Sequence, residues 1–199
     1  MDNKNINNVR KVILVKKRLA VYVLLFILLA GVSLTVNAQD INYPEVDGVF
    51  NSDEYENTMY VEDIDMEVGW LIRDGNLIFA VKSSGKGWVA AGFDPTTMMR
   101  NANIIIGDVK EDGSLVIEDH FGVSNTGHRA DDENNILQAA GTENEEGTVL
   151  EFVIPLNSGD DMDRILEVGQ EYKVILAYHM NNDSLKIRHS NRGSVNITF

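Results

Sequence analysis

The 199-residue chain contains no cysteine and only three prolines. The absence of cysteine excludes disulfide bonds, thiolate catalysis, iron–sulfur ligation, cysteine-attached haem and a lipidated N-terminal cysteine. Three prolines are too few for a rigid linker between two domains, and about 160 residues beyond the N-terminal segment suffice for one sizeable core. We therefore expect a single domain that folds without disulfides.

Basic residues are scarce, and many of them gather at the N-terminus. Residues 1–38 hold six of the 17 Lys and Arg and one of the 31 Asp and Glu, so the remainder carries 11 basic and 30 acidic residues, a net charge of −19. A field of this sign repels phosphate backbones and anionic lipid surfaces. Nucleic acid is therefore not an expected partner.

The chain also lacks the short motifs of several enzyme classes. It has no Gly-x-Ser-x-Gly elbow, no His-Glu-x-x-His helix and no phosphate-binding glycine loop. Its many carboxylates show no pairing in the sequence that points to acid–base catalysis. An independent enzyme is therefore the least supported class of function.

The N-terminal segment has the order of charges and apolar residues found in secretory signals. A basic start is followed by an apolar run over residues 19–36 and by small residues before Gln39. This order predicts a signal peptide over residues 1–38, cleaved after Ala38, and a secreted or extracytoplasmic location at the periplasm or cell surface. The alternative is an uncleaved membrane anchor, because the run is near the lower limit for spanning a bilayer. Membrane attachment is expected only in that case.

The remaining chain is rich in period-two apolar patterns that predict strands. Residues 39–62 are interpreted as a lead-in segment of the sandwich with a short edge strand near residues 59–61, and the main domain as residues 63–199. Met66, Val68, Trp70 and Ile72 share one face of the first long strand. We expect it to form a three-stranded meander with the runs at residues 77–84 and 88–93.

Four further runs and a closing strand repeat the pattern, and one segment differs from it. Residues 158–168 predict a short helix with acids in its first turn and Ile165 and Leu166 on its buried side. The spacing of the strands predicts an all-β fold, a single immunoglobulin-like antiparallel β-sandwich with one short helix.

Two acidic clusters have the residue types of calcium ligands. They are Asp131-Asp132-Glu133 and the group of Glu143, Glu145 and Glu146. Neither has the spaced oxygen pattern of a known calcium loop, so both are interpreted as solvated turns.

The closing run "LKIRHSNRGSVNITF" carries a histidine in an apolar phase. In an extended strand Leu185, Ile187 and His189 fall on one face, and His189 points inward. An inward imidazole is either a hydrogen-bonded core residue or a ligand. The run alone leaves both open.

Four strings in the same order resemble the DOMON domain family over roughly residues 63–199. They are "GWVAAGFDPTTMMRNANIIIGDV", "EDHFGVSNTGHRADDENN", "TVLEFVIPLNSGDDMDRIL" and "RHSNRGS". The resemblance implies an immunoglobulin-like sandwich that holds either a b-type haem or a carbohydrate-like ligand. The haem-binding members act in electron transfer with a partner protein, and the alternative here is an extracytoplasmic sugar- or small-ligand-binding module without haem.

The resemblance also implies the residues that hold the haem. The iron ligands of the family match Met99, or less well Met98, and His189. The sequence departs from the family pattern at Asn101, where glycine is usual, and at Asn103, where aspartate is usual. These departures leave open which methionine reaches the iron.

Other residues near these positions are candidates for supporting roles. A thioether and a neutral imidazole suit low-spin haem iron. Arg188, Arg192 and Arg100 are candidates to pair with the haem propionates. An apolar shell is expected from Trp88, Phe93 and Phe121. Of the other histidines, His128 is expected to be solvated, His120 lies beside Phe121, and His179 is an alternative ligand.

Overall fold

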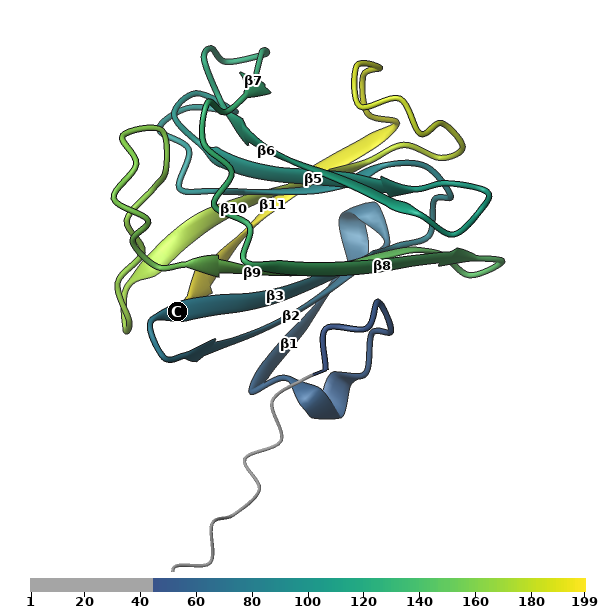
Figure 1. Cartoon of the computed structure of the whole chain (residues 1–199), viewed down its shortest axis with the longest axis horizontal. Coiled ribbons are helices and arrows are strands. Elements are labelled where there is room, and N and C mark those ends of the chain that lie inside the picture. Colours follow the sequence, from purple (N-terminus) through teal and green to yellow (C-terminus); the bar gives the residue numbers. More distant parts are fainter. Residues whose placement is uncertain (1–44) are drawn as a thin grey trace, which may run out of the picture. The chain divides into compact units, whose positions relative to one another are not determined.

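The computed structural model describes residues 45–199, so the predicted signal peptide and part of the lead-in segment lie outside the described residues. Two antiparallel sheets form the two layers of a sandwich (Figure 1). The predicted all-β sandwich is thus confirmed. In the first sheet the order is β1 (Asn57–Val61), β2 (Met66–Arg73), β3 (Asn76–Ser83), β9 (Gly147–Pro155) and β8 (Gln138–Asn144). In the second the order is β11 (Asn191–Thr198), β10 (Glu171–Tyr178), β4 (Val89–Phe93), β5 (Asn103–Val109), β6 (Leu115–Phe121) and β7 (Arg129–Ala130).

The inner core lies between the two sheets. Met66, Val68 and Trp70 of β2 face it, as their alternation predicts, and so do the alternate residues of the strands that pack opposite. Phe79 contacts both Phe93 and Phe152, with ring centroids 5.2 and 5.6 Å apart. Aromatic packing of this kind fills much of the space between the layers.

The predicted meander is wrong at its third strand. The β2–β3 hairpin forms, with Asp74 and Gly75 both at positive φ as a two-residue type I′ turn requires. The glycine-rich residues 84–87 then cross from one sheet to the other, and β4 pairs with β5 and β10. A Cβ at Gly87 would lie 2.4 Å from the backbone oxygen of Asn182, so this crossing is packed against the chain before β11.

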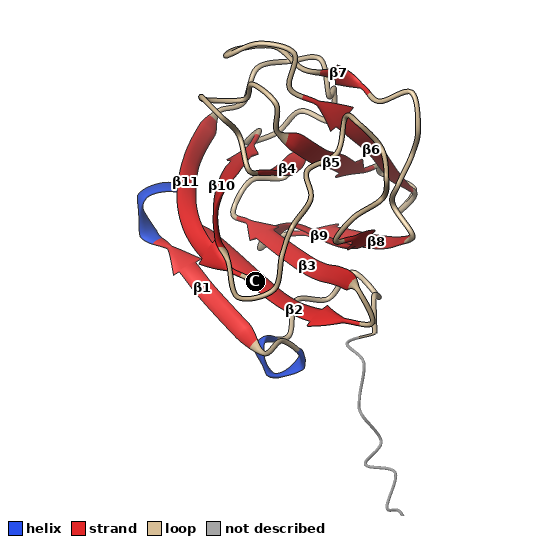
Figure 2. Ribbon diagram, turned by 90° about the vertical axis from the view of Figure 1, so that its left-hand side faces the viewer, coloured by secondary structure: helices blue, strands red, loops and turns tan. Residues whose placement is uncertain are grey.

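The predicted helix over residues 158–168 is also wrong. The segment is a series of turns, and among residues 45–199 helical structure is confined to two 3₁₀ turns, η1 (Ser52–Glu54) and η2 (Glu62–Ile64) (Figure 2). Side chains compete with the helix for its backbone amides: Ser158 accepts from the Asp160 N–H at 3.1 Å and Asp160 from the Met162 N–H at 2.8 Å. Leu166 is buried as expected, whereas Ile165 is 59% exposed.

The strand expected to contain His189 begins later than predicted. β11 starts at Asn191, and residues 179–190 form the loop that precedes it. No helix in the described part of the chain is long and apolar enough to cross a membrane.

Candidate functional site

A second apolar cluster covers the outer face of the six-stranded sheet. Strand alternation directs Ile105 to the inner core and its neighbours Ile104 and Ile106 to the opposite face. The same face carries two residues of the β4 region, Trp88 and Ala90, and two residues of β10, Ile175 and Ala177. The three consecutive isoleucines 104–106 are therefore all buried, because this strand is covered on both faces.

Three loops border this face around a partly open cavity of about 730 Å³, here called the outer cavity. They join β4 to β5, β6 to β7 and β10 to β11. The volume of the outer cavity falls in the range typical of small-molecule and cofactor sites. The floor is the apolar cluster just described, and the rim carries polar and charged side chains.

The outer cavity brings together the residues that the sequence predicted as haem ligands and neighbours. Met98, Met99, Arg188, His189 and Arg192 all line it, although the two groups are about 90 positions apart. His189 reaches it from a loop and not, as predicted, from the inward face of a strand.

The two methionines occupy a tight turn over residues 97–100, here called the methionine turn. The Arg100 N–H donates to the Thr97 carbonyl at 3.0 Å. Met98 has a positive φ of 55° and is 45% exposed. Met99 is half-buried and packs against the apolar floor. The turn therefore gives the two methionines different environments, and Met99 has the drier one.

Of the two departures from the family pattern, the one at Asn101 has a structural explanation. Its φ is 62°, in the left-handed region that glycine adopts freely and that asparagine tolerates better than most residues. Its N–H donates to the Gly122 carbonyl at 2.7 Å. At Gly122 itself a Cβ would lie 1.6 Å from the Met99 oxygen, so only glycine allows this close approach.

The imidazole of His189 is half-buried and close to two cations. Burial lowers its pKa, and the positive charges of Arg192 and Arg188 lower it further. The neutral imidazole, which is the metal-ligating form, is therefore favoured near neutral pH.

Several expected supporting residues have different roles from those predicted. Trp88 lines the outer cavity, but Phe93 lies in the inner core and Phe121 is not part of the lining. Arg100 does not line it either, and its Nε donates to Asn125 Oδ1 at 3.3 Å. Single-sequence alternation could not assign Phe93, because residues on both faces of β4 are buried.

The environments of the other histidines also differ from the predictions. His128 is half-buried and lines the outer cavity, so the expectation that it is solvated is wrong. Its Nδ1 lies 2.6 Å from Nδ1 of His120, whose Nε2 contacts Glu118 at 2.7 Å. His179 is not part of the lining, and its Nδ1 accepts from the Asn181 N–H.

One set of acidic residues is brought together that the sequence did not connect. Asp119, Asp131 and Asp163 place one carboxylate oxygen each within 4.8 Å of one another. The sequence grouped Asp131 with Asp132 and Glu133, which are exposed. No periodic signal links three positions on separate elements, so only the fold reveals this cluster.

Comparison with known proteins agrees with this architecture. The family model of the DOMON domain matches residues 62–179, which include Met99 and end before His189. DBH-like monooxygenase protein 1 of Homo sapiens is 29% identical over 130 residues, which are 64% of this chain and 21% of that protein. The chain thus spans about a fifth of that relative's length.

Two solved structures superimpose on this chain, and only for the first does the TM-score indicate a shared fold. The cytochrome b domain of pyranose dehydrogenase from Coprinopsis cinerea superimposes with a TM-score of 0.56 at 14% identity, covering 78% of this chain and 85% of that one. For the cytochrome domain of Myriococcum thermophilum cellobiose dehydrogenase the TM-score is 0.44 at 13% identity, over 70% and 86% of the two chains. The sandwich fold and the family model, which matches more than half of the sequence, lead to one conclusion: this chain belongs to the DOMON domain family.

Proposed function

We propose that the outer cavity holds a b-type haem and that Met99 and His189 would ligate its iron. The observation that carries this proposal is the convergence of these two residues, from loops far apart in the sequence, on one cavity with an apolar floor. A soft thioether and a neutral imidazole are the ligand pair of many electron-transfer cytochromes. The fold it shares with a cytochrome b domain supports the same assignment.

The residues around the cavity suit the rest of a haem group. Ile104, Ile106 and Ile175 offer a dry surface to a porphyrin ring. Arg188 and Arg192 lie on the rim, where guanidinium groups pair with carboxylates in bidentate fashion. Trp88 lines the cavity, and its buried Nε1 has no hydrogen-bond acceptor among the described residues.

The chain's own residues prepare this site for one-electron chemistry. Bound haem would supply reversible oxidation and reduction of its iron, and methionine–histidine ligation raises the potential relative to two histidines. Burial and the charges of Arg192 and Arg188 lower the pKa of His189 and so favour its neutral form. Asn101 and Gly122 hold the methionine turn against the sheet.

The biological role that follows is electron transfer with a partner protein by an exported domain. The proposed export depends on the predicted signal peptide over residues 1–38, and an uncleaved segment would anchor the domain to a membrane. The net charge of −19 beyond that segment favours a redox partner with a cationic surface.

A second candidate function is binding of a sugar or another small polar ligand without haem. It is supported by the amide and hydroxyl groups of Asn125, Thr126 and Ser194 on the cavity rim. Such groups recognise hydroxyl-rich ligands by paired hydrogen bonds.

Haem titration followed by ultraviolet–visible spectroscopy separates the two candidates. The wild-type protein is expected to give a low-spin spectrum with one haem per chain. His189→Ala should abolish it, and Met99→Ala should retain weaker haem binding and admit carbon monoxide at the vacated position.

Two variants serve as controls for this titration. Met98→Ala and His128→Ala alter other residues that line the same cavity and should leave the low-spin spectrum intact. If wild-type protein shows no Soret band beyond that of free haem, the haem proposal is wrong and the ligand-binding module takes its place.

A further inference from the structure

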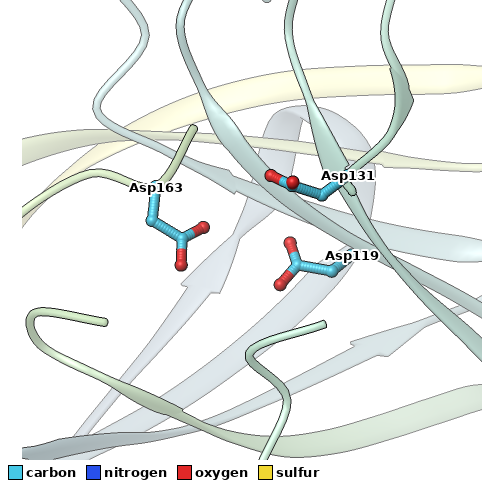
Figure 3. Close-up of side chains that lie close together, drawn as sticks. All are labelled: Asp119, Asp131 and Asp163. Carbon is cyan, nitrogen blue, oxygen red and sulfur yellow. The ribbon is translucent and has the colours of Figure 1, made fainter. Parts of the chain in front are cut away.

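A cluster of three carboxylates lies apart from the residues that line the outer cavity. Asp119 belongs to β6, Asp131 directly follows β7, and Asp163 lies in the connection from β9 to β10. One oxygen of each lies within 4.8 Å of the other two, and the three side chains point toward a common centre (Figure 3). We call these residues the aspartate triad.

Asp119 is buried and Asp131 and Asp163 are half-buried, and each carboxylate has one buried oxygen without a protein donor in the described part of the chain. Asp119 is 5% exposed. Its Oδ1, Oδ2 of Asp131 and Oδ1 of Asp163 are all buried and have no hydrogen-bond partner among residues 45–199. Buried carboxylate oxygens in this state are costly unless something binds them.

Each of the three carboxylates also accepts a hydrogen bond from the protein. Oδ2 of Asp119 accepts from the Asn135 N–H at 3.1 Å, and Oδ1 of Asp131 accepts from the Glu133 N–H at 3.2 Å. Asp163 receives a side-chain hydrogen bond from Ser158. One oxygen of Asp119 and one of Asp131 thus accept from backbone amides, and the second oxygen of each has no protein donor among the described residues.

The charge of the triad is not balanced by the arginines nearest in sequence. Arg129 pairs with Asp132, and Arg164 pairs with Asp94. Burial, followed by the neighbouring charges of Asp163, Asp131 and Asp160, raises the pKa of Asp119 to about 7 despite the Asn135 amide. Burial and the charges of Asp131, Asp160 and Glu133 likewise raise the pKa of Asp163.

We propose that the aspartate triad binds a divalent cation with a preference for oxygen ligands, and that Ca²⁺ is the ion it suits best. Three carboxylates and no nitrogen or sulfur donor select a hard cation. Two oxygens that ligate one Ca²⁺ at about 2.4 Å lie at most about 4.8 Å apart, so the spacing of the triad meets this requirement as it stands. Mg²⁺ is usually held by one or two carboxylates, and its shorter bonds demand a tighter cage.

A bound cation would connect both layers of the sandwich. Asp119 belongs to the six-stranded sheet, while the segments with Asp131 and Asp163 lead to β8 and away from β9 of the five-stranded sheet. The ion would therefore stabilise the end of the molecule at which these connections cross, and would leave the methionine turn untouched.

The test is calorimetric titration of the full chain with CaCl₂ after removal of metals with EDTA, without added haem. One Ca²⁺ per chain is expected to bind, and an excess of 100-fold over the dissociation constant should raise Tm by about 5 °C or more. MgCl₂ should bind at least about tenfold more weakly. Because no haem is present, failure of the haem proposal would not affect this result.

Asp163→Asn and Asp161→Asn form a matched pair of variants. Asp161 is an exposed acid two positions away in the same loop. Asp163→Asn should weaken Ca²⁺ binding by about 100-fold, as loss of a charged ligand does, while Asp161→Asn should not change it. Equal effects of the two substitutions, or no Ca²⁺ binding by the wild type, would overturn the proposal.

Asp119→Asn should raise Tm in the absence of metal, whereas a variant that merely misfolds would lower it. The sign of the change in Tm therefore separates loss of the cation site from misfolding. In metal-free protein at pH 8 the amide removes like-charge repulsion from a buried cluster, so Tm should rise. The same variant should lose the increase of Tm caused by Ca²⁺. A variant that melts lower than wild type without metal would show that the triad is held by protein contacts alone.

Discussion

The two outer faces of this sandwich are covered differently. On the five-stranded sheet, Leu71, Ile78 and Ala80 form an apolar patch that Phe50 and Tyr55, from the segment before β1, cover. On the six-stranded sheet, the larger patch around Ile104 and Ile106 is bordered by three loops that leave a cavity of about 730 Å³.

The covered face is held by one buried acid. Glu151 of β9 is fully buried, accepts from the Gly48 N–H at 2.7 Å and the Asp47 N–H at 3.0 Å, and receives the hydroxyl of Tyr55. Burial raises the pKa of Glu151 even though these donors oppose the shift. The chain thus uses its lead-in segment, which the sequence presents as a plain loop, to cover the apolar patch of one face.

The difference teaches that the covering segment decides where this sandwich can hold a ligand. Both sheets are apolar on both faces, so each outer face needs a second layer. Where the chain supplies a hydrogen-bonded segment, the apolar patch is covered and a smaller cavity of about 540 Å³ remains beside it, lined by Ile78 and Val153 and mostly polar neighbours. Where it supplies three loops, the face keeps a larger cavity with an apolar floor, and Met99 and His189 belong to its lining.

The largest expected effect falls on the covered face. Glu151→Ala leaves two buried N–H groups and the Tyr55 hydroxyl without an acceptor, and should lower the free energy of unfolding by about 3–5 kcal/mol. Urea denaturation measures this loss. Glu145→Ala, at an exposed ion pair with Lys86, is the matched control and should change stability by less than about 1 kcal/mol. Equal losses would mean that Glu151 does not hold the segment.

A smaller effect is expected behind the methionine turn. Gly122→Ala places a methyl group where the Met99 carbonyl lies, so the turn must shift; we expect about 1–3 kcal/mol of destabilisation and weaker haem binding. Gly113→Ala is the control, because its φ of 82° strains an alanine by about 1 kcal/mol in open space. Haem affinity should fall for Gly122→Ala alone, and an unchanged affinity would show that Met99 does not need this position.

The smallest effect on stability is expected at the border of the outer cavity. Ile187 is 44% exposed, so Ile187→Ser should change the free energy of unfolding by less than about 0.5 kcal/mol. Haem affinity should nevertheless fall by about fivefold, because the side chain lines the cavity. Val168→Ser, at a more exposed valine outside the cavity, should change neither quantity. A loss of stability without loss of affinity at Ile187 would argue that this loop is structural.

Much of the fold followed from local patterns in the sequence. The alternation of Met66, Val68 and Trp70 predicted the inner face of β2 correctly, because strand side chains alternate wherever one face is buried. The prediction of a helix after β9 was wrong. The acidic and apolar residues there have the spacing of a helix, but side chains accept hydrogen bonds from the backbone amides and the segment forms turns. Helix periodicity over so short a stretch cannot compete with such local hydrogen bonds.

The sequence by itself determined the all-β class, the positions of most long strands along the chain and the presence of methionine and histidine residues near the β4–β5 and β10–β11 loops. Only the tertiary structure decided that His189 reaches the cavity from a loop, that Phe93 belongs to the inner core, and that three distant aspartates converge. The physical reason is that period and composition specify which side chains are buried. Which of two buried faces they occupy, and which distant loops they meet there, depends on how the sheets pair and pack.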